Sequence, residues 1–154
     1  MTEAGISGVL GVGSELAGSV RVMTAERIQW YDSAMLSAAK GELARVGTNI
    51  HTDDEYAKSQ GLRAVIADGM ISTNWLSSMM LTHFGMNYLE RGELRTKFIK
   101  PIFLGAVVSP RGRVQAVERR ENGALSYTLE VWCEDEKGEK LTVGDARVEV
   151  APRP

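Results

Sequence analysis

The sequence predicts an α+β fold in which a curved antiparallel sheet wraps around one buried helix, at about residues 69–84. The first supporting observation is an apolar stretch from Gly69 to Leu89 that contains no Lys, Arg, Asp or Glu. The second is a change after Gly92 in the apolar repeat, from the 3.6 residues of a helix to the 2 residues of a strand. Helices followed by strands favour segregated layers, and a length of 154 residues suits one domain.

The first third of the chain carries weaker structural signals. Four glycines within residues 1–13 predict a flexible N-terminal segment, so that the folded domain spans residues 14–151. Alternation at residues 20–22 indicates a short strand. Thr24 can then cap a helix through its hydroxyl, with an acidic residue in the first turn. The stretch at residues 33–47 is rich in small residues and supports no assignment.

A second helix start is well marked. Thr52 stands three residues before Glu55 in an acidic first turn, which is the pattern of a capping box. The helix should end near Gly61, because glycine suits the position just past a helix C-terminus. His51 is therefore predicted to lie in a loop held by the cap of this short helix.

The central helix is predicted to open at Asp68-Gly69 and to end at Gly85. Its polar side carries only small uncharged groups, so this side is also expected to face protein. The methionines, Met70 included, are predicted to lie in the core. Two apolar lines with helical spacing define the buried side: Ile71, Trp75 and Met79, and Leu76, Met80 and Phe84.

The C-terminal part reads as antiparallel strands joined by tight turns. The predicted strands run from residue 94 towards Pro101, from 113 to 120, from 125 to 133 and from 141 to 150, with Asn-Gly and Lys-Gly turns between the last three. Cys133 alternates with apolar residues on the third of these strands and is expected to be inert. Arg95, Lys97 and Lys100 are interpreted as the solvated face of the first strand, with contacts to coenzyme A phosphates as the alternative.

Composition excludes several classes of function. The formal net charge is −2 and the 18 Lys and Arg residues are scattered, which argues against nucleic acid or an anionic membrane as partner. One cysteine and two histidines cannot form a Cys/His zinc site or an internal disulfide. Gly69–Leu89 is too polar for a bilayer span. With no signal peptide recognised, we expect a cytoplasmic protein that needs no metal.

Three short motifs follow one another in a recognisable order. Asn49–Asp53 reads Asn-Ile-His-Thr-Asp, Ile66–Met70 reads Ile-Ala-Asp-Gly-Met, and Lys97–Gly105 reads Lys-Phe-Ile-Lys-Pro-Ile-Phe-Leu-Gly. They are similar to the Asn-Pro-(Leu/Ile)-His, (Ile/Val)-(Ala/Val)-His-Gly-Met and Arg-Phe-x-x-Pro-Val-x-x-Gly motifs of one family. With its spacing over roughly residues 14–150, the chain resembles the MaoC-like (R)-specific enoyl-CoA hydratase/dehydratase family of hot-dog proteins.

The resemblance implies a single hot-dog domain that hydrates a trans-2-enoyl thioester reversibly. The acyl group would be carried on coenzyme A or an acyl carrier protein, with no other cofactor. His51 would be catalytic, with Asn49, the backbone amide of Gly69 and Met70 in the substrate site. The family pairs its His with an Asp, but here Val46 or Gly47 stands at that position, depending on the alignment.

Asp68 replaces the histidine that precedes Gly-Met in the family, and it is the candidate for the missing acid. It could orient His51 or activate a water, or it could simply cap the central helix. The imidazole of His51 suits proton transfer near neutral pH, or a hydrogen bond within its loop. The first N–H groups of a helix, at Gly69, can hold a thioester oxygen as it becomes enolate-like. The alternative is that Gly69 only begins the helix and has no role in binding. Asn49 could position water or substrate, or belong to a turn.

Three hypotheses for function follow from these residues. The first is an enoyl-thioester hydratase or dehydratase with a departed catalytic motif. The second is a hot-dog acyl-CoA thioesterase, in which an acidic group activates water at the carbonyl carbon. The third is a non-catalytic acyl-thioester-binding subunit of a heteromeric hydratase. An uncovered sheet edge also predicts a homodimer or a higher homo-oligomer.

Overall fold

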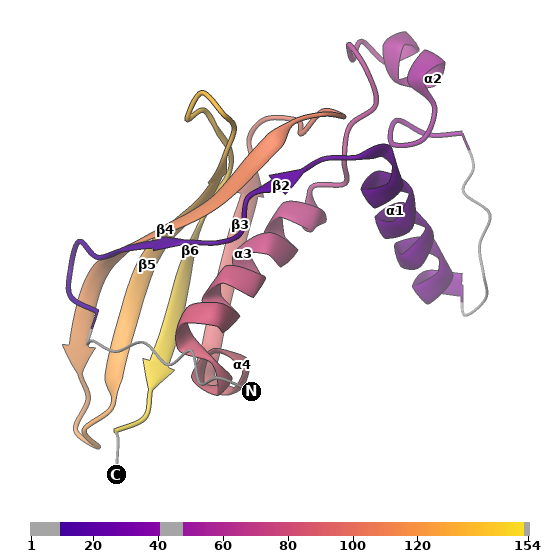
Figure 1. The fold of residues 1–154 in the computed structure, drawn as a ribbon. Helices are drawn as coiled ribbons and strands as arrows, with labels where there is room; N and C mark the ends of the chain where they lie inside the picture. Colours follow the sequence, from indigo (N-terminus) through magenta and orange to yellow (C-terminus); the bar gives the residue numbers. More distant parts are fainter. Residues whose placement is uncertain (1–9, 41–47, 153–154) are drawn as a thin grey trace.

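The computed structural model describes residues 10–40 and 48–152, which form a sheet curved around one long helix (Figure 1). The helices are α1 (Ala25–Lys40), α2 (Asp54–Ser59), α3 (Met70–Phe84) and α4 (Met86–Arg91). The strands are β1 (Glu15–Ala17), β2 (Arg21–Val22), β3 (Gly92–Phe98), β4 (Val107–Arg119), β5 (Leu125–Glu134) and β6 (Lys140–Val150).

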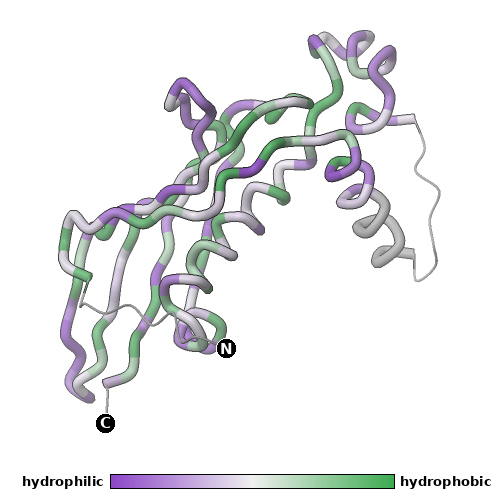
Figure 2. Tube along the Cα trace, in the orientation of Figure 1, coloured by the Kyte–Doolittle hydropathy of each residue, from purple (hydrophilic) through white to green (hydrophobic). Residues whose placement is uncertain are grey.

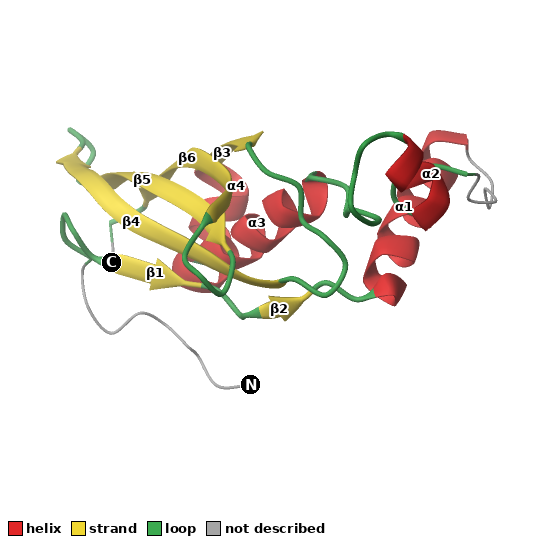
Figure 3. Cartoon of the chain, turned by 90° about the horizontal axis from the view of Figure 1, so that it is seen from above, coloured by secondary structure: helices red, strands yellow, loops and turns green. Residues whose placement is uncertain are grey.

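The strands form one antiparallel sheet in the order β1-β4-β5-β6-β3, and β2 pairs with β4 beside β1. A bulge between Val114 and Ala116 interrupts the pairing of β4 with β5, and bulges of this kind increase the local bend of a strand. Seen from above, α3 lies against one face of the sheet, while α1 and α2 lie beyond one end of it (Figure 3). The predicted α+β hot-dog arrangement is confirmed.

The core lies between α3 and the concave face of the sheet. Hydrophobic and hydrophilic residues alternate along the strands (Figure 2), so each strand turns one apolar face inward. Both predicted apolar lines of α3 pack into this core, with Leu76 and Met80 fully buried. On β5 the predicted inward residues Tyr127, Leu129 and Val131 are buried too. Dispersion and apolar burial therefore hold the helix to the sheet.

The predicted hairpin turns are present and are held by backbone hydrogen bonds. Gly123 has φ 82° and the Arg120 N–H donates to the Ala124 carbonyl at 2.8 Å. The strand before that turn begins earlier than predicted, at Val107. Pro110 obscured its start, since proline normally avoids paired strand interiors. Here Pro110 lies on β4 opposite the gap between β1 and β2. A missing N–H at this position therefore removes no hydrogen bond from the pairing with either strand.

The N-terminal predictions are only partly within the described residues. The cap of α1 is confirmed, because the Arg27 N–H donates to the Thr24 hydroxyl at 3.2 Å. The helix then runs to Lys40 through part of the stretch that supported no assignment. Residues 1–9 and 41–47 lie outside the described residues, so the flexible segment at 1–13 and the domain limits stay predictions.

The capping box predicted at Thr52 is wrong by one residue. Asp53 is the N-cap of α2, and its carboxylate accepts a hydrogen bond from the Tyr56 N–H at 2.9 Å. The Thr52 hydroxyl is engaged elsewhere, because it donates to the side-chain oxygen of Asn49 at 3.1 Å. The predicted end of the helix is confirmed, with Gly61 at φ 83° just beyond its C-cap.

Two predictions about α3 also need correction. Met70 is 41% exposed and does not belong to the core, although Met79 and Met80 do. The polar side of the helix faces protein only in part. Ser72 is buried against Thr142 and is 2.8 Å from it, oxygen to oxygen. Asn74, Ser78 and Thr82 are exposed, because the sheet covers only one flank of the polar side.

Candidate active site

A tight turn holds the loop that carries His51. The side-chain oxygen of Asn49 accepts hydrogen bonds from the His51 N–H at 2.8 Å and from the Thr52 hydroxyl at 3.1 Å. The Asn49 carbonyl accepts the Asp53 N–H at 3.1 Å, just before α2 begins. Asn49 thus organises the turn, which fixes where the His51 side chain leaves the backbone.

The imidazole of His51 is fixed by the segment that leads into α3. Its Nδ1 lies 2.8 Å from the Ile66 carbonyl oxygen, and the Ile66 N–H donates to the Ile50 carbonyl at 3.2 Å. A carbonyl can only accept, so we assign the proton to Nδ1. In the neutral ring Nε2 then carries a lone pair, and no hydrogen bond within the described residues engages it. His51 is therefore arranged as a base.

The start of α3 leaves one backbone donor available. The Asp68 carboxylate accepts the Met70 N–H at 2.8 Å, and the Asp68 carbonyl accepts the Ile71 N–H at 3.1 Å. No bond of the described chain engages the N–H of Gly69. A free N–H at a helix N-terminus carries partial positive charge and suits an oxygen that gains negative charge.

Gly69 has a packing role as well. A Cβ at this position would lie 2.6 Å from Cδ2 of Phe98, whose side chain comes from the end of β3. Only glycine lets this ring approach the helix start so closely. Phe98 is itself 47% exposed, so the ring forms a partly open cover over the helix terminus.

His51 and Gly69 line the same pocket, which has a volume of about 320 Å³. Asn49, Asp68 and Met70, also singled out from the sequence, do not line it. The one cation in the lining is Lys100, which forms an ion pair with Glu139. The full lining consists of His51, Ile66, Ala67, Gly69, Phe98, Ile99, Lys100, Pro101, Ile102 and Thr142.

Asp68 caps the helix and lies close to α1. The pKa of Tyr31 is raised, mainly by burial and in second place by the negative charge of Asp68. The hydrogen bond from the Asn74 amide lowers this pKa by a smaller amount. That amide donates to the Tyr31 hydroxyl at 3.1 Å. The orienting bond to His51 comes from the Ile66 carbonyl, so the structure gives Asp68 the capping role and leaves water activation as a prediction.

Sequence reasoning missed a carboxylate that α1 brings to the His51 loop. Asp32 is buried, with 9% of its surface exposed, and it accepts a hydrogen bond from the Asn49 amide nitrogen at 3.3 Å. It lies 17 residues before Asn49, on another helix. The only signal in the sequence was the helical spacing of its neighbours Ile28 and Tyr31.

The second histidine and the cysteine lie outside the pocket. His83 is in the last turn of α3, where its Nε2 is 3.1 Å from the Ala17 carbonyl oxygen at the end of β1. Burial, and secondarily the charge of Glu134, raises the pKa of Cys133 to about 12, as expected for an inert thiol. Within the described residues no cluster of His, Cys, Asp and Glu could hold a metal ion.

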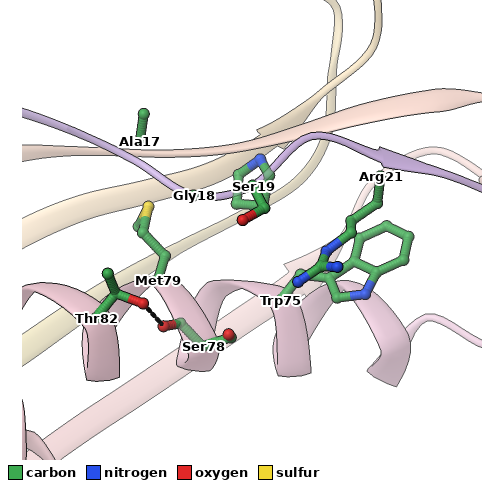
Figure 4. Close-up of a pocket in the computed structure, with 9 residues that line it drawn as sticks. Ala17, Gly18, Ser19, Arg21, Trp75, Ser78, Met79 and Thr82 are labelled. Carbon is green, nitrogen blue, oxygen red and sulfur yellow. Dashed lines mark hydrogen bonds between the residues drawn. The ribbon is translucent and has the colours of Figure 1, made fainter. Parts of the chain in front are cut away.

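A second pocket, of about 270 Å³, lies on the other flank of α3 (Figure 4). It is bounded by Trp75 and Met79 of the helix and by Arg21 of β2, and the Thr82 hydroxyl donates to the Ser78 carbonyl at 2.9 Å on its wall. It shares no lining residue with the His51 pocket, and no residue singled out from the motifs lines it.

A sheet wrapped around α3, with His51 and Gly69 lining one pocket at the start of that helix, is the architecture of a hot-dog protein. The chain belongs to the MaoC-like family, since the model of the MaoC like domain matches residues 48–145. This is a hydratase/dehydratase family. No curated protein matches the chain by sequence. Among the described helices, none has both the length and the hydropathy needed to cross a membrane.

Solved structures agree with this assignment at the level of the fold. The MaoC-like dehydratase from Rhodospirillum rubrum has a TM-score of 0.71 and 17% identity, over 94% of this chain and 95% of that one. The (R)-hydratase from A. caviae has a TM-score of 0.66 and 19% identity, over 93% and 98%. The 3R-hydroxyacyl-ACP dehydratase complex HadBC from Mycobacterium tuberculosis has a TM-score of 0.62 and 16% identity, over 90% and 96%.

Proposed function

We propose that this protein is a hydro-lyase that adds water to, or removes it from, an enoyl thioester carried on coenzyme A or an acyl carrier protein. The single observation that carries the proposal is the pocket that His51 and Gly69 both line. Among the described residues no hydrogen bond engages Nε2 of His51 or the N–H of Gly69. The similarity in fold to an (R)-hydratase and to a 3R-hydroxyacyl-ACP dehydratase supports the same reaction class.

The chemistry divides between the two groups. The Gly69 N–H donates a hydrogen bond to the thioester oxygen, which withdraws electrons from the conjugated double bond and favours attack at the β-carbon. Nε2 of His51 takes a proton from water as the oxygen of that water bonds to the β-carbon. The negative charge reaches the thioester oxygen as an enolate. The α-carbon then takes up the proton held by the His51 imidazolium, which returns His51 to its neutral form. One water is consumed, no electron is transferred, and no cofactor beyond the thioester carrier is required.

The surroundings of the pocket support a thioester with a polar carrier. Phe98, Ile99 and Ile102 provide an apolar wall for the acyl part, and Lys100 stands at the same pocket as a cation. Arg95 and Lys97 are exposed on β3, whose end forms part of the lining. A carrier with phosphate groups would find these cations close to the pocket.

We also propose that the protein works as a homodimer or a higher homo-oligomer. Within the described chain β3 pairs only with β6, so its other edge offers free backbone donors and acceptors. The related structure of HadBC is a complex, which makes a heteromeric partner the alternative that a measurement of mass in solution would reveal.

The test is turnover of the purified protein with a panel of trans-2-enoyl-CoA and saturated acyl-CoA thioesters, following enoyl absorbance and free thiol together. We expect loss of enoyl absorbance without thiol release. His51→Ala should lower the rate about 100- to 10,000-fold. His83→Ala, which changes the other histidine far from the pocket, serves as the matched control and should retain activity.

The other outcomes separate the remaining hypotheses. Release of thiol that depends on His51 would make the protein a thioesterase. Saturable binding of the thioesters without either reaction would identify a binding subunit. Either result contradicts the proposed hydratase reaction.

A further inference from the structure

Asp32 is a carboxylate in an unusual environment for a surface helix. It is 9% exposed, on the side of α1 that faces the His51 loop. Within the described residues no Lys, Arg or His side chain forms an ion pair with it. Burial of a carboxylate is costly unless its oxygens are hydrogen-bonded, so the hydrogen bond that Asp32 accepts from Asn49 is the contact that matters here.

Its contact is with the residue that organises the His51 turn. An ionised carboxylate can only accept hydrogen bonds, so Asp32 requires the NH₂ end of the Asn49 amide to point towards it, at 3.3 Å. The oxygen end of the same amide must then point the other way. There it accepts the His51 N–H at 2.8 Å and the Thr52 hydroxyl at 3.1 Å. The Asp32 carboxylate and the His51 N–H therefore favour the same orientation of the Asn49 amide, and Asp32 holds the end of the amide that lies away from His51.

The connection continues from the turn to the imidazole. The Ile66 carbonyl accepts a hydrogen bond from Nδ1 of His51, and His51 lines the pocket shared with Gly69. This second contact works only while the turn holds the His51 backbone in its present position. A reversed Asn49 amide would present donors to the His51 N–H and would break the turn at its centre.

We propose that Asp32 is a positioning residue of this site, whose carboxylate orients Asn49 and through it keeps the His51 base in register with the Gly69 N–H. The inference rests on the proposed hydratase function, and it adds a residue of α1 to the machinery. Asp32 does not touch the substrate in this scheme. Its effect depends on the donor and acceptor directions of two hydrogen bonds, from Asn49 to Asp32 and from the His51 N–H to Asn49. Exchanging the Asp and Asn side chains reverses the direction of the first bond and keeps a side chain of the same size at each position.

The experiment exchanges the two side chains. Asp32→Asn leaves two amides that can both flip, and Asn49→Asp places two carboxylates against each other. In the double variant Asp32→Asn/Asn49→Asp, the new amide donates to the new carboxylate, which in turn accepts from the His51 N–H and the Thr52 hydroxyl. Asp145→Asn, on an exposed position of β6, is the matched control and should behave as the wild type.

For enoyl-thioester hydration we expect each single variant to lose about 10- to 100-fold in kcat, since displacement of a reacting group by about 1 Å has effects of this size. KM should stay within about twofold, because neither Asp32 nor Asn49 lines the pocket and its apolar wall and the Gly69 N–H are unchanged. The double variant should recover kcat to within about fivefold of the wild type. A wild-type kcat in Asp32→Asn, or a double variant no faster than the slower single variant, would overturn the proposal.

A second readout separates this inference from the proposed function. Hydrogen exchange of the His51 backbone amide, followed by NMR, reports its bond to Asn49 whether or not the protein turns over any thioester. Both single variants should exchange this amide about tenfold faster or more, and the double variant should restore protection. Unchanged exchange in the single variants would overturn the proposal. The Leu76 amide, in the core part of α3, should keep its protection in every variant and shows that each is folded.

If the wild type leaves every enoyl thioester unchanged, the proposed function fails, and the exchange data alone then decide whether Asp32 positions the His51 turn.

Discussion

The sheet with α3 and the loop with His51 are held together by different forces. The first region buries apolar side chains from both layers, and residues such as Leu76, Leu129 and Val131 have no exposed surface. The second region is formed by α1, residues 48–53 and α2. The only buried residue of α2 is Ala57, so little apolar area stabilises that helix. We call these two parts the packed region and the polar loop region.

In the polar loop region, hydrogen bonds of specified direction take the place of packing. Asn49 bridges Asp32 to the His51 and Thr52 groups, and the Asp53 carboxylate caps α2. Each such bond contributes about 0.5–1.5 kcal/mol net, less than a buried leucine, but it fixes orientation. The packed region thus supplies stability, while the polar loop region supplies geometry to the pocket. Substitutions in the two regions should therefore differ in whether stability or activity changes.

The largest expected effect on stability comes from Leu76→Ala in the packed region. Its side chain is fully buried in α3, and truncation leaves a cavity that the sheet can fill only in part. We expect the free energy of unfolding to fall by about 2–5 kcal/mol, measured by urea denaturation. The turnover rate per folded molecule should stay close to that of the wild type. A rate that fell in parallel with stability would erase the distinction between the regions.

Much of the packed region was predictable because its sequence repeats with the period of its structure. The two apolar lines of α3 and the alternation of β5 each specify which face is buried, whatever the neighbouring element is. Asn122-Gly123 likewise marks a turn through local backbone preference alone. The polar loop region lacks such a repeat. Thr52 and Asp53 both satisfy a capping pattern, and only the contact of Thr52 with Asn49 decides between them.

The candidate site shows the same contrast. His51 and Gly69 were found because they stand within motifs, and both line the pocket. Asp32 was missed because its partner lies 17 residues away on a different element, so no spacing in the sequence reveals it. Met70 was predicted in the core from its apolar character alone, although it begins α3 where the sheet no longer covers the helix. Tertiary contacts, which no local spacing in the sequence encodes, decided the outcomes for Asp32 and Met70.

A smaller effect is expected where the two regions meet, at Gly69. An added methyl group would lie 2.6 Å from the Phe98 ring, so Gly69→Ala must displace the ring. We expect a loss of about 1–3 kcal/mol in unfolding free energy, as for other overpacked sites. When Gly69→Ala is made in the Phe98→Ala variant, it should lower the unfolding free energy much less, because the obstructing ring is gone. A double-mutant cycle by chemical denaturation measures this coupling, and a coupling near zero would contradict the contact.

Smaller again is the effect of removing the cap of α2. Asp53→Ala should lower stability by about 1 kcal/mol, since the Tyr56 N–H loses its acceptor. Asp54→Ala removes an exposed carboxylate next in sequence, which forms a surface ion pair with Lys58, and its effect should be the lesser of the two. Thermal unfolding compares the variants. If Asp54→Ala were the more damaging change, the cap would have been assigned to the wrong residue.

The comparison that most directly separates the two regions concerns Cys133, whose ionisation leaves stability unaffected at neutral pH. Its thiol is buried between the sheet and α3 and lies 3.7 Å from the Ser72 carbonyl. The raised pKa of about 12, against an ordinary value of 9.0, means that the unfolded chain loses the thiol proton first as the pH rises. The free energy of unfolding should therefore be insensitive to this group below pH 9.0 and should decline from there towards pH 12.

At pH 8, labelling of Cys133 by a thiol reagent then requires opening of the packed region, since the folded thiol is both buried and protonated. Leu76→Ala should accelerate labelling about 30-fold or more, in proportion to its loss of stability. His51→Ala should leave the labelling rate within about twofold of the wild type, because the polar loop region can lose its order without opening the core. Equal acceleration by both variants would mean that the His51 loop and the sheet open as one unit, and the two regions would then share a single stability.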